Sequence, residues 1–156
     1  MKIENNFLDQ EKFEELQNII MGEMFSWFYN DIVDFVDDKN KYQFIHLFYN
    51  NYVPTSDNIK IINPILIKLD PISLWRIKAN LLTKTLNIVE NEFHVDMGVE
   101  YKDGVVVVTS EEKLKHFTTS IFYVNSNNGY TNFEDGTKVE SVANRMVTFP
   151  TNMKHK

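Results

Sequence analysis

The sequence predicts an α+β protein that is mainly β, in which helices come first and antiparallel strands follow. Helical periodicity is confined to the part of the chain before Pro71, and short runs rich in β-forming residues fill the part after it. No amphipathic helix separates these runs, which indicates a sandwich or barrel and not a series of βαβ units.

The first helix is expected from Asp9 to about Met21. Phe13, Leu16 and Ile20 recur there at steps of three and four residues between charged side chains, which is the pattern of an amphipathic helix. Asp9 suits its N-cap, because a short carboxylate accepts hydrogen bonds from the first free backbone N–H groups.

A second helical stretch is expected to follow, first aromatic over residues 24–29 and then acidic over residues 31–38. We expect the aromatic part to be mostly buried and the acidic part to be a solvated face. After a loop over residues 50–58, a short helix is expected from Asn63 to about Leu69, with Asn63 as its N-cap and Pro64 in its first turn.

The β-forming runs extend over residues 73–83, 88–96, 105–109, 118–125, 138–142 and 145–149. Turn signals rich in Gly, Asn and Asp lie at residues 102–104, 125–129 and 134–136. The chain has no internal repeat or linker, so we expect a single domain over residues 1–156. Residues 1–71 would be a helical leader packed on a β-core of residues 72–156.

The composition limits the available chemistry. The chain of 156 residues has no cysteine, which excludes disulfides and thiolate sites, so any metal must bind His, Asp or Glu. A formal charge of -6 argues against nucleic acid as a partner, because binding to the phosphate backbone favours basic proteins. The sequence has no secretory h-region and no apolar stretch of roughly 20 residues, which predicts a cytoplasmic protein without a membrane partner.

His94 and Asp96 are the strongest candidates for a metal site. They lie two residues apart at the end of a predicted strand, so their side chains leave from the same face. His155 follows a strand broken by Pro150 and can return beside them in an antiparallel sheet. Two imidazoles and one carboxylate suit iron(II), but the spacing alone also fits a histidine hydrogen-bonded to a nearby carboxylate in an ordinary strand.

The other histidines are interpreted differently. His46 is flanked by apolar residues, which is more typical of an interior histidine with satisfied ring nitrogens than of a metal ligand. His116 lies near Lys113 and Lys115 and is expected at the surface.

Further motifs follow in a fixed order: RIKANL at 76–81, FHVD at 93–96, TSIFYVN at 119–125, GYTNFEDG at 129–136, VANRMVTF at 142–149 and His155. This order resembles the iron(II)- and 2-oxoglutarate-dependent oxygenase superfamily, most closely its prolyl-hydroxylase-like branch and small members from marine bacteriophages. The resemblance covers about residues 72–156. It implies a double-stranded β-helix, or jelly roll, preceded by N-terminal helices.

The resemblance also implies three iron(II) ligands: His94, Asp96 and His155. Tyr123 matches the family's tyrosine that hydrogen-bonds the far carboxylate of 2-oxoglutarate, and its alternative is an ordinary core tyrosine. Asn80 and Thr131 lie on strands expected to line the same pocket. Arg145 is expected to be structural and to pair with an acidic neighbour.

The sequence departs from the family pattern at its end. The family carries a basic residue, usually Arg, on the strand after the second histidine, where it pairs with the far carboxylate of 2-oxoglutarate. Here the sequence stops at Lys156. We therefore expect a β-core without its last strand, His155 on a fraying terminus, weak 2-oxoglutarate binding, and an open strand edge that allows a homo-oligomer.

The leading functional hypothesis is a non-haem iron(II) dioxygenase that decarboxylates 2-oxoglutarate to succinate and hydroxylates a C–H bond of an unnamed substrate. The phage-like resemblance implies a bacterium or a phage-infected host as its setting. The alternative is a catalytically inactive jelly-roll binding or interaction module with a vestigial metal site. A cupin-like protein is a third possibility, but cupins usually use three histidines and a glutamate, which this chain does not space suitably.

Overall fold

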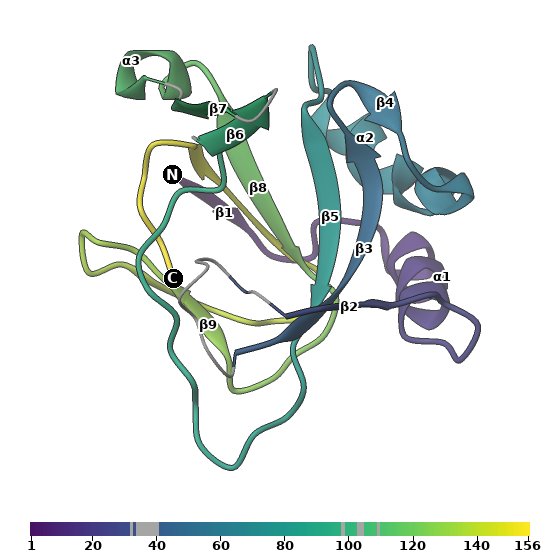
Figure 1. The fold of residues 1–156 in the computed structure, drawn as a ribbon. Coiled ribbons are helices and arrows are strands. Elements are labelled where there is room, and N and C mark those ends of the chain that lie inside the picture. Colours follow the sequence, from purple (N-terminus) through teal and green to yellow (C-terminus); the bar gives the residue numbers. More distant parts are fainter. Residues whose placement is uncertain (32, 34–40, 98, 103–104, 109) are drawn as a thin grey trace. The chain divides into compact units, whose positions relative to one another are not determined.

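The structure is a computed structural model that describes residues 1–31, 33, 41–97, 99–102, 105–108 and 110–156. It is α+β and mainly β, as the sequence predicts, and its described strand pairs are antiparallel (Figure 1). The chain divides into two compact units. The first unit is Leu8–Leu86, and the second unit combines Met1–Phe7 with Asn87–Lys156.

The first unit consists of short helices and one sheet. Its elements are α1 (Gln10–Ile20), β2 (Phe28–Asn30), β3 (Gln43–Asn50), β4 (Val53–Pro54), the 3-10 helix η1 (Asp57–Ile62), α2 (Asn63–Leu69) and β5 (Arg76–Leu81). Helix α1 buries Phe13, Leu16 and Ile20, as their spacing predicts. Asp9 occupies its N-cap position, but the side chain makes no capping hydrogen bond.

Strand β3 is the centre of the sheet in the first unit. Phe44 pairs with Tyr29 of β2 and with Leu81 of β5, so both edges of β3 are hydrogen-bonded (Figure 1). β4 pairs with the other end of β3, at Tyr49 and Asn50, and His46 and Phe48 are buried between the two ends.

The second unit is built around β11 (Arg145–Pro150). This strand lies between β1 (Lys2–Glu4) and β8 (Thr118–Tyr123) in an antiparallel sheet. Neighbours on both edges satisfy its backbone, and Met146, Val147 and Phe149 are at most 1% exposed. The start of the chain therefore pairs with the strand that leads to His155.

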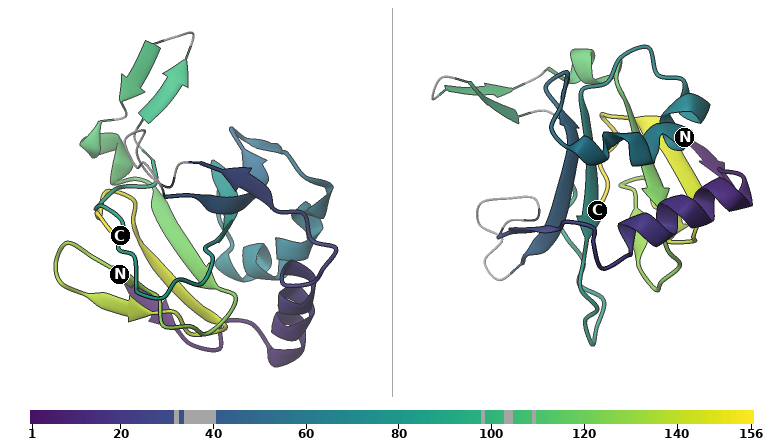
Figure 2. Two further views of the ribbon diagram at one scale, coloured as in Figure 1. Left: turned by 60° about the horizontal axis from the view of Figure 1, so that its bottom comes forward. Right: turned by 90° about the vertical axis from the view of Figure 1, so that its right-hand side faces the viewer.

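A hairpin of β9 (Tyr130–Asn132) and β10 (Lys138–Glu140) lies against this sheet (Figure 2). A single hydrophobic cluster contains Phe133 and Val139 from the hairpin region together with Val147 and Phe149 from β11. Gly136 closes the hairpin with a φ of 86°, a conformation that glycine adopts without strain.

The last residues are hydrogen-bonded on both sides within the second unit. His155 forms backbone bridges with His94 and with Phe133, and Lys156 exchanges backbone hydrogen bonds of 2.8 and 2.9 Å with Asn132. His155 is 4% exposed. The expectation that His155 lies on a fraying terminus is therefore wrong. The expected open edge beside β11 is also wrong, because β1 occupies it.

The second unit has three further elements: β6 (Val99–Lys102), β7 (Val105–Val108) and α3 (Glu111–Leu114). The two strands pair with each other as a hairpin. Among the described residues, no helix has the length and apolar character needed to cross a membrane.

The expected second helical stretch is wrong over its aromatic part, residues 24–29. Residues 28–30 form strand β2, and Phe28 and Tyr29 are 59% and 64% exposed, so only Phe25 of the aromatic series is fully buried. Aromatic residues favour strands once a partner is available, and β3, which was also not predicted, supplies that partner. Most of the acidic series, residues 32 and 34–38, lies outside the described residues.

The short helix is confirmed as α2, although Ile62 takes the N-cap position expected for Asn63. Five of the six expected β-forming runs contain strands, namely β5, β7, β8, β10 and β11. The run at 88–96 does not, since its described residues make only a single backbone bridge, at His94. Strands β1, β6 and β9 were not predicted. The turns at 125–129 and 134–136 are confirmed, whereas residues 103–104 lie outside the described part of the chain.

The antiparallel sheets are not shown to form a jelly roll, so that finer fold stays a prediction. The number of domains also stays a prediction. The two compact units do not follow the expected division at residues 71 and 72, because β5 groups with the earlier elements and β1 with the later ones.

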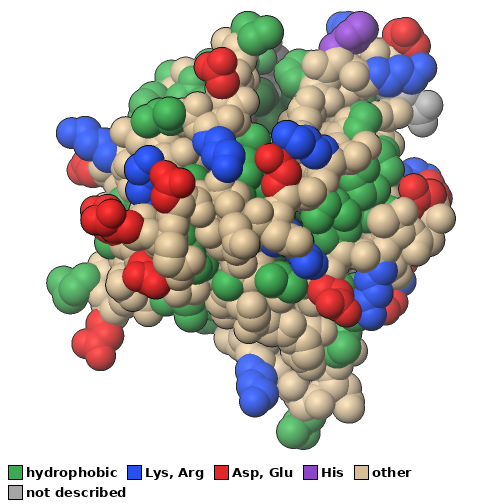
Figure 3. Space-filling view, turned by 180° about the vertical axis from the view of Figure 1, so that it is seen from behind, with side chains coloured by type: hydrophobic (Ala, Val, Ile, Leu, Met, Phe, Trp, Pro, Cys, Tyr) green, Lys and Arg blue, Asp and Glu red, His purple; other side chains and the backbone are tan. Residues whose placement is uncertain are grey.

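The surface carries charges of both signs. On the face shown in Figure 3, acidic and basic side chains are interspersed, and hydrophobic side chains also reach the surface.

We predict that replacing Val147 by Ala lowers the free energy of unfolding by about 2 kcal/mol, because it removes buried methyl groups and leaves a cavity. Val147 is 0% exposed, whereas Val89, in the same unit, is 56% exposed. Val89→Ala should change the free energy of unfolding by less than about 0.5 kcal/mol. Urea denaturation of both variants checks this, and equal effects would contradict the assigned core.

Candidate metal centre

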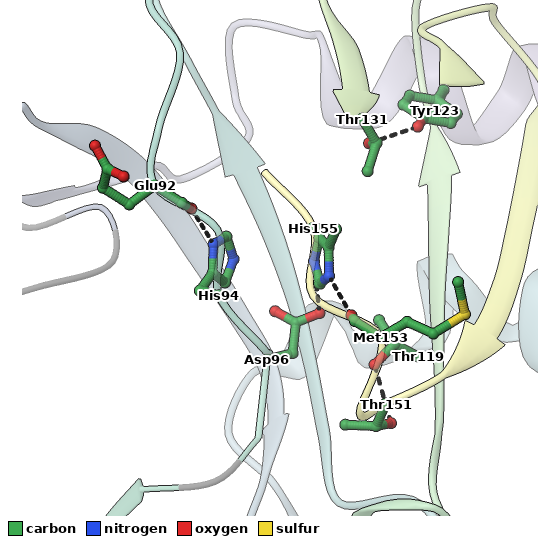
Figure 4. Close-up of polar contacts among 9 residues, drawn as sticks. All are labelled: Glu92, His94, Asp96, Thr119, Tyr123, Thr131, Thr151, Met153 and His155. Atoms are coloured by element: carbon green, nitrogen blue, oxygen red, sulfur yellow. Dashed lines mark hydrogen bonds and ion pairs between the residues drawn. The ribbon is translucent and has the colours of Figure 1, made fainter. Parts of the chain in front are cut away.

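His94, Asp96 and His155 come together in the second unit. One ligand atom from each lies within 4.8 Å of the others, and the three side chains face one another in Figure 4. This cluster could hold a metal ion. Asp96 Oδ2 and His155 Nε2 lie 3.5 Å apart, which suits two atoms that bind one ion through bonds of about 2 Å.

The backbone brings the two histidines side by side. The His94 N–H donates to the His155 carbonyl at 2.9 Å, and the His155 N–H donates to the His94 carbonyl at 3.0 Å. This reciprocal pair places the imidazole centroids 4.8 Å apart. Asp96 follows two residues later and adds a carboxylate from the same segment.

Each histidine is oriented by a backbone carbonyl two residues before it. His94 Nδ1 lies 3.1 Å from the Glu92 carbonyl oxygen, and His155 Nδ1 lies 3.2 Å from the Met153 carbonyl oxygen. A carbonyl oxygen only accepts, so each Nδ1 carries a proton, and in the neutral imidazole each Nε2 then presents a lone pair. Metal-binding histidines in proteins are commonly oriented through their second nitrogen in this way.

This orientation bears on the simpler interpretation of a histidine hydrogen-bonded to a carboxylate. The distance of 3.5 Å between His155 Nε2 and Asp96 Oδ2 exceeds the usual 2.7–3.2 Å range of an N–H···O hydrogen bond. With the proton on Nδ1, the Nε2 lone pair and the carboxylate are both donors suited to a shared cation. The geometry therefore fits a shared cation, and it also fits an ion pair between a protonated His155 and Asp96.

The surroundings of the cluster are apolar on the His155 side. The rings of Phe149 and Phe133 lie 4.9 and 6.0 Å from the His155 imidazole, between centroids. The Asp96 side chain is more open, with 30% of its surface exposed against 6% for the His155 side chain. One side of the cluster is thus sealed by the hydrophobic core, and the other is accessible.

Tyr123 and Thr131 form a second polar pair in the same unit. The Tyr123 hydroxyl lies 2.7 Å from Thr131 Oγ1 (Figure 4). The Tyr123 ring packs against the cluster that contains Phe133 and Phe149. Burial raises the pKa of Tyr123 above its ordinary value, although the Thr131 hydrogen bond and the charge of Arg145 oppose this. Tyr123 therefore stays neutral at neutral pH and keeps its hydroxyl proton.

The structure does not group Asn80 with this site. Asn80 is an exposed residue of β5, opposite Ile45 in the first unit, so its expected role beside the co-substrate stays a prediction. Arg145 donates to the Asn5 side-chain carbonyl and to the Glu140 backbone carbonyl, both at 2.8 Å. Arg145 thus has the structural role expected of it, but these partners are neutral oxygens and not the expected acidic side chain.

The remaining histidines lie where the sequence indicates. His46 is 3% exposed, and its Nδ1 and Nε2 atoms lie 2.7 Å from the Ser26 carbonyl and 2.8 Å from Ser56 Oγ. It is an interior histidine with both ring nitrogens satisfied. His116 is exposed.

Sequence reasoning missed several residues of this region. The Glu92 and Met153 carbonyls orient the histidines, but every residue has a backbone carbonyl, so the residue types do not indicate which ones accept these hydrogen bonds. Glu90, Tyr130 and Lys156 form a polar network beside the cluster, and their side chains are close only because the chain folds back. No signal in the sequence indicates these contacts.

Comparisons with protein-family models, with curated proteins and with solved structures find no match to this chain.

We predict that replacing Asp96 by Ala weakens the binding of a divalent metal by more than about 100-fold, because one of three ligands is lost. The fold should change little, with a loss of at most about 1 kcal/mol in the free energy of unfolding, since Asp96 contributes little packing. Anaerobic titration with iron(II) or cobalt(II) measures the affinity. His116→Ala removes an exposed histidine and should bind metal like the parent protein; equal weakening in both variants would contradict the assigned site.

Proposed function

We propose that His94, Asp96 and His155 bind iron(II) and that the protein is a 2-oxoglutarate-dependent oxygenase. The observation that carries the proposal is the convergence of two imidazoles and one carboxylate, with both histidines oriented through Nδ1. The order of motifs that resembles the oxygenase superfamily supports it.

The donor set fits the proposed metal. Two neutral imidazoles and one carboxylate, with no thiolate in the chain, form the mixed nitrogen and oxygen set typical of non-haem iron(II) oxygenases. Three protein ligands leave further coordination positions open for a co-substrate and oxygen. Bound iron(II) would supply the oxygen chemistry, in which 2-oxoglutarate, oxygen and a C–H bond give succinate, carbon dioxide and a C–OH group.

The residues of the chain would bind and orient the reactants. On binding, the hydroxyls of Tyr123 and Thr131, which are 2.7 Å apart and have one proton each, would exchange their mutual hydrogen bond for hydrogen bonds to the far carboxylate of 2-oxoglutarate. The raised pKa of Tyr123 keeps that hydroxyl protonated and therefore able to donate. Phe133 and Phe149 beside His155 would keep water from one side of the metal.

We predict that the protein forms succinate from 2-oxoglutarate only when iron(II) and oxygen are present, and that Asp96→Ala forms none above background. Chromatographic detection of succinate measures this. Metal binding without 2-oxoglutarate binding or succinate formation would instead support the alternative, a catalytically inactive binding or interaction module with a vestigial metal site. No metal binding at all would contradict the oxygenase.

We predict that Tyr123→Phe weakens 2-oxoglutarate binding by about 10- to 100-fold, because a hydrogen bond to a charged group is lost. Iron(II) affinity should be unchanged, since Tyr123 is not a ligand. Anaerobic calorimetric titration of the metal-free protein with iron(II), and then of the iron-loaded protein with 2-oxoglutarate, measures the two affinities. Tyr52→Phe removes the same hydroxyl from a residue that is 59% exposed and should bind like the parent protein. Unchanged affinity in Tyr123→Phe would show that Tyr123 is an ordinary core tyrosine.

A further inference from the structure

The segment that leads to His94 has no regular structure of its own. Residues 87–93 belong to neither a strand nor a helix, and at His94 the backbone makes a single bridge, to His155. A metal site works only when its ligands are held within about 0.5 Å of the productive geometry. Side chains must therefore help to hold this segment in place.

Glu90 makes such contacts with both of its carboxylate oxygens. The Tyr130 hydroxyl on β9 donates to Glu90 Oε1 at 2.5 Å, and the Lys156 ammonium donates to Glu90 Oε2 at 2.5 Å. The Lys156 Nζ atom also lies 4.9 Å from the centre of the Phe93 ring, which directly precedes His94. Glu90 thus connects the segment before His94 to the residue after His155 and to the β9–β10 hairpin.

The network is stabilised by charge. The pKa of Glu90 is lowered, first by the hydrogen bond from Lys156 and then by the one from Tyr130, so the carboxylate is ionised at neutral pH. Lys138 of β10 lies with its Nζ atom 3.7 Å from the centre of the Tyr130 ring, which adds a cation–π contact to the same group of residues.

We propose that Glu90 is a positioning residue that, through Tyr130 and Lys156, holds His94 and His155 at the distance a shared metal ion requires. This inference rests on the proposed metal site, but it requires neither 2-oxoglutarate binding nor oxygenase activity. Glu90 does not touch the ion in this role. It acts by keeping the two ligand-bearing segments together.

A simple electrostatic effect predicts a different pattern. A carboxylate near a cation strengthens its binding and an ammonium weakens it, whatever the contacts between them. Under that view Glu90→Gln weakens metal binding, Lys156→Met strengthens it, and Tyr130→Phe, which is neutral, leaves it unchanged. Under the positioning role all three changes break the same network and all three weaken binding.

The test is a cobalt(II) titration of these three variants beside the parent protein. We expect Glu90→Gln and Lys156→Met each to weaken the affinity about fivefold and Tyr130→Phe about threefold, since partly exposed polar contacts contribute modestly. Glu134→Gln is the matched control. It breaks another ion pair to the same terminal segment, Glu134 Oε1 to Lys154 Nζ at 3.6 Å, without touching residues 87–93, and should bind cobalt(II) like the parent protein.

Hydrogen exchange of the His94 amide in the metal-free protein is the second measurement. The His94 N–H donates to the His155 carbonyl, so a loosened segment exposes it, and exchange should be about fivefold faster in the three variants but not in Glu134→Gln. Tighter cobalt(II) binding by Lys156→Met, or unchanged exchange in all variants, would overturn the positioning role. If the parent protein bound no metal but the His94 amide still exchanged faster in the three variants, the proposed function would be wrong. The role of Glu90 in holding the segment before His94 would then stand.

Discussion

The candidate site depends on one pair of backbone hydrogen bonds, those exchanged by His94 and His155. Neither residue is part of a regular strand, yet the reciprocal pairing fixes both α-carbons opposite each other and brings the imidazoles together. Asp96 joins them because it lies two residues further along the same segment. Without this bridge, the three donor groups would belong to two independent parts of the chain.

The bridge is itself supported by the hydrophobic cluster below it. Strand β11 is paired on both edges, so it can bury Val147 and Phe149 completely and can carry the chain from this core to His155. Phe133 connects the hydrophobic cluster to the terminal segment, since its side chain packs in the cluster and its backbone forms a bridge with His155. The terminal segment is therefore held by packing and hydrogen bonds together, which explains why His155 is buried and not frayed.

The electrostatic properties of the site come from backbone atoms as much as from side chains. The carbonyls of Glu92 and Met153 accept hydrogen bonds from the two Nδ1 atoms. The two Nε2 atoms are therefore left available to a shared cation. Around these ligands, Tyr123 is kept neutral by burial, whereas Glu90 is kept ionised by Lys156 and Tyr130. The second unit thus contains a neutral hydroxyl, that of Tyr123, suited to donating a hydrogen bond to an anionic ligand. It also contains a charged carboxylate, that of Glu90, suited to holding two of the unit's segments together.

The sequence by itself determined the mainly β character, helices α1 and α2 and five of the strands, because these depend on local periodicity. His94 and Asp96 were named from their spacing, whereas His155, far along the chain, was named with them from the resemblance of the motif order. The sequence failed where partners are distant along the chain. The aromatic residues of β2 form a strand because β3 pairs with them, and β1 is recognisable only through its pairing with β11. Only the tertiary structure decided that residues 88–96 make a single bridge, that His155 is sealed against Phe133 and Phe149, and that Glu90 meets Lys156. Each of these contacts joins residues far apart in the chain, and a contact of that kind is set by the packing of the whole unit and not by the residues beside it.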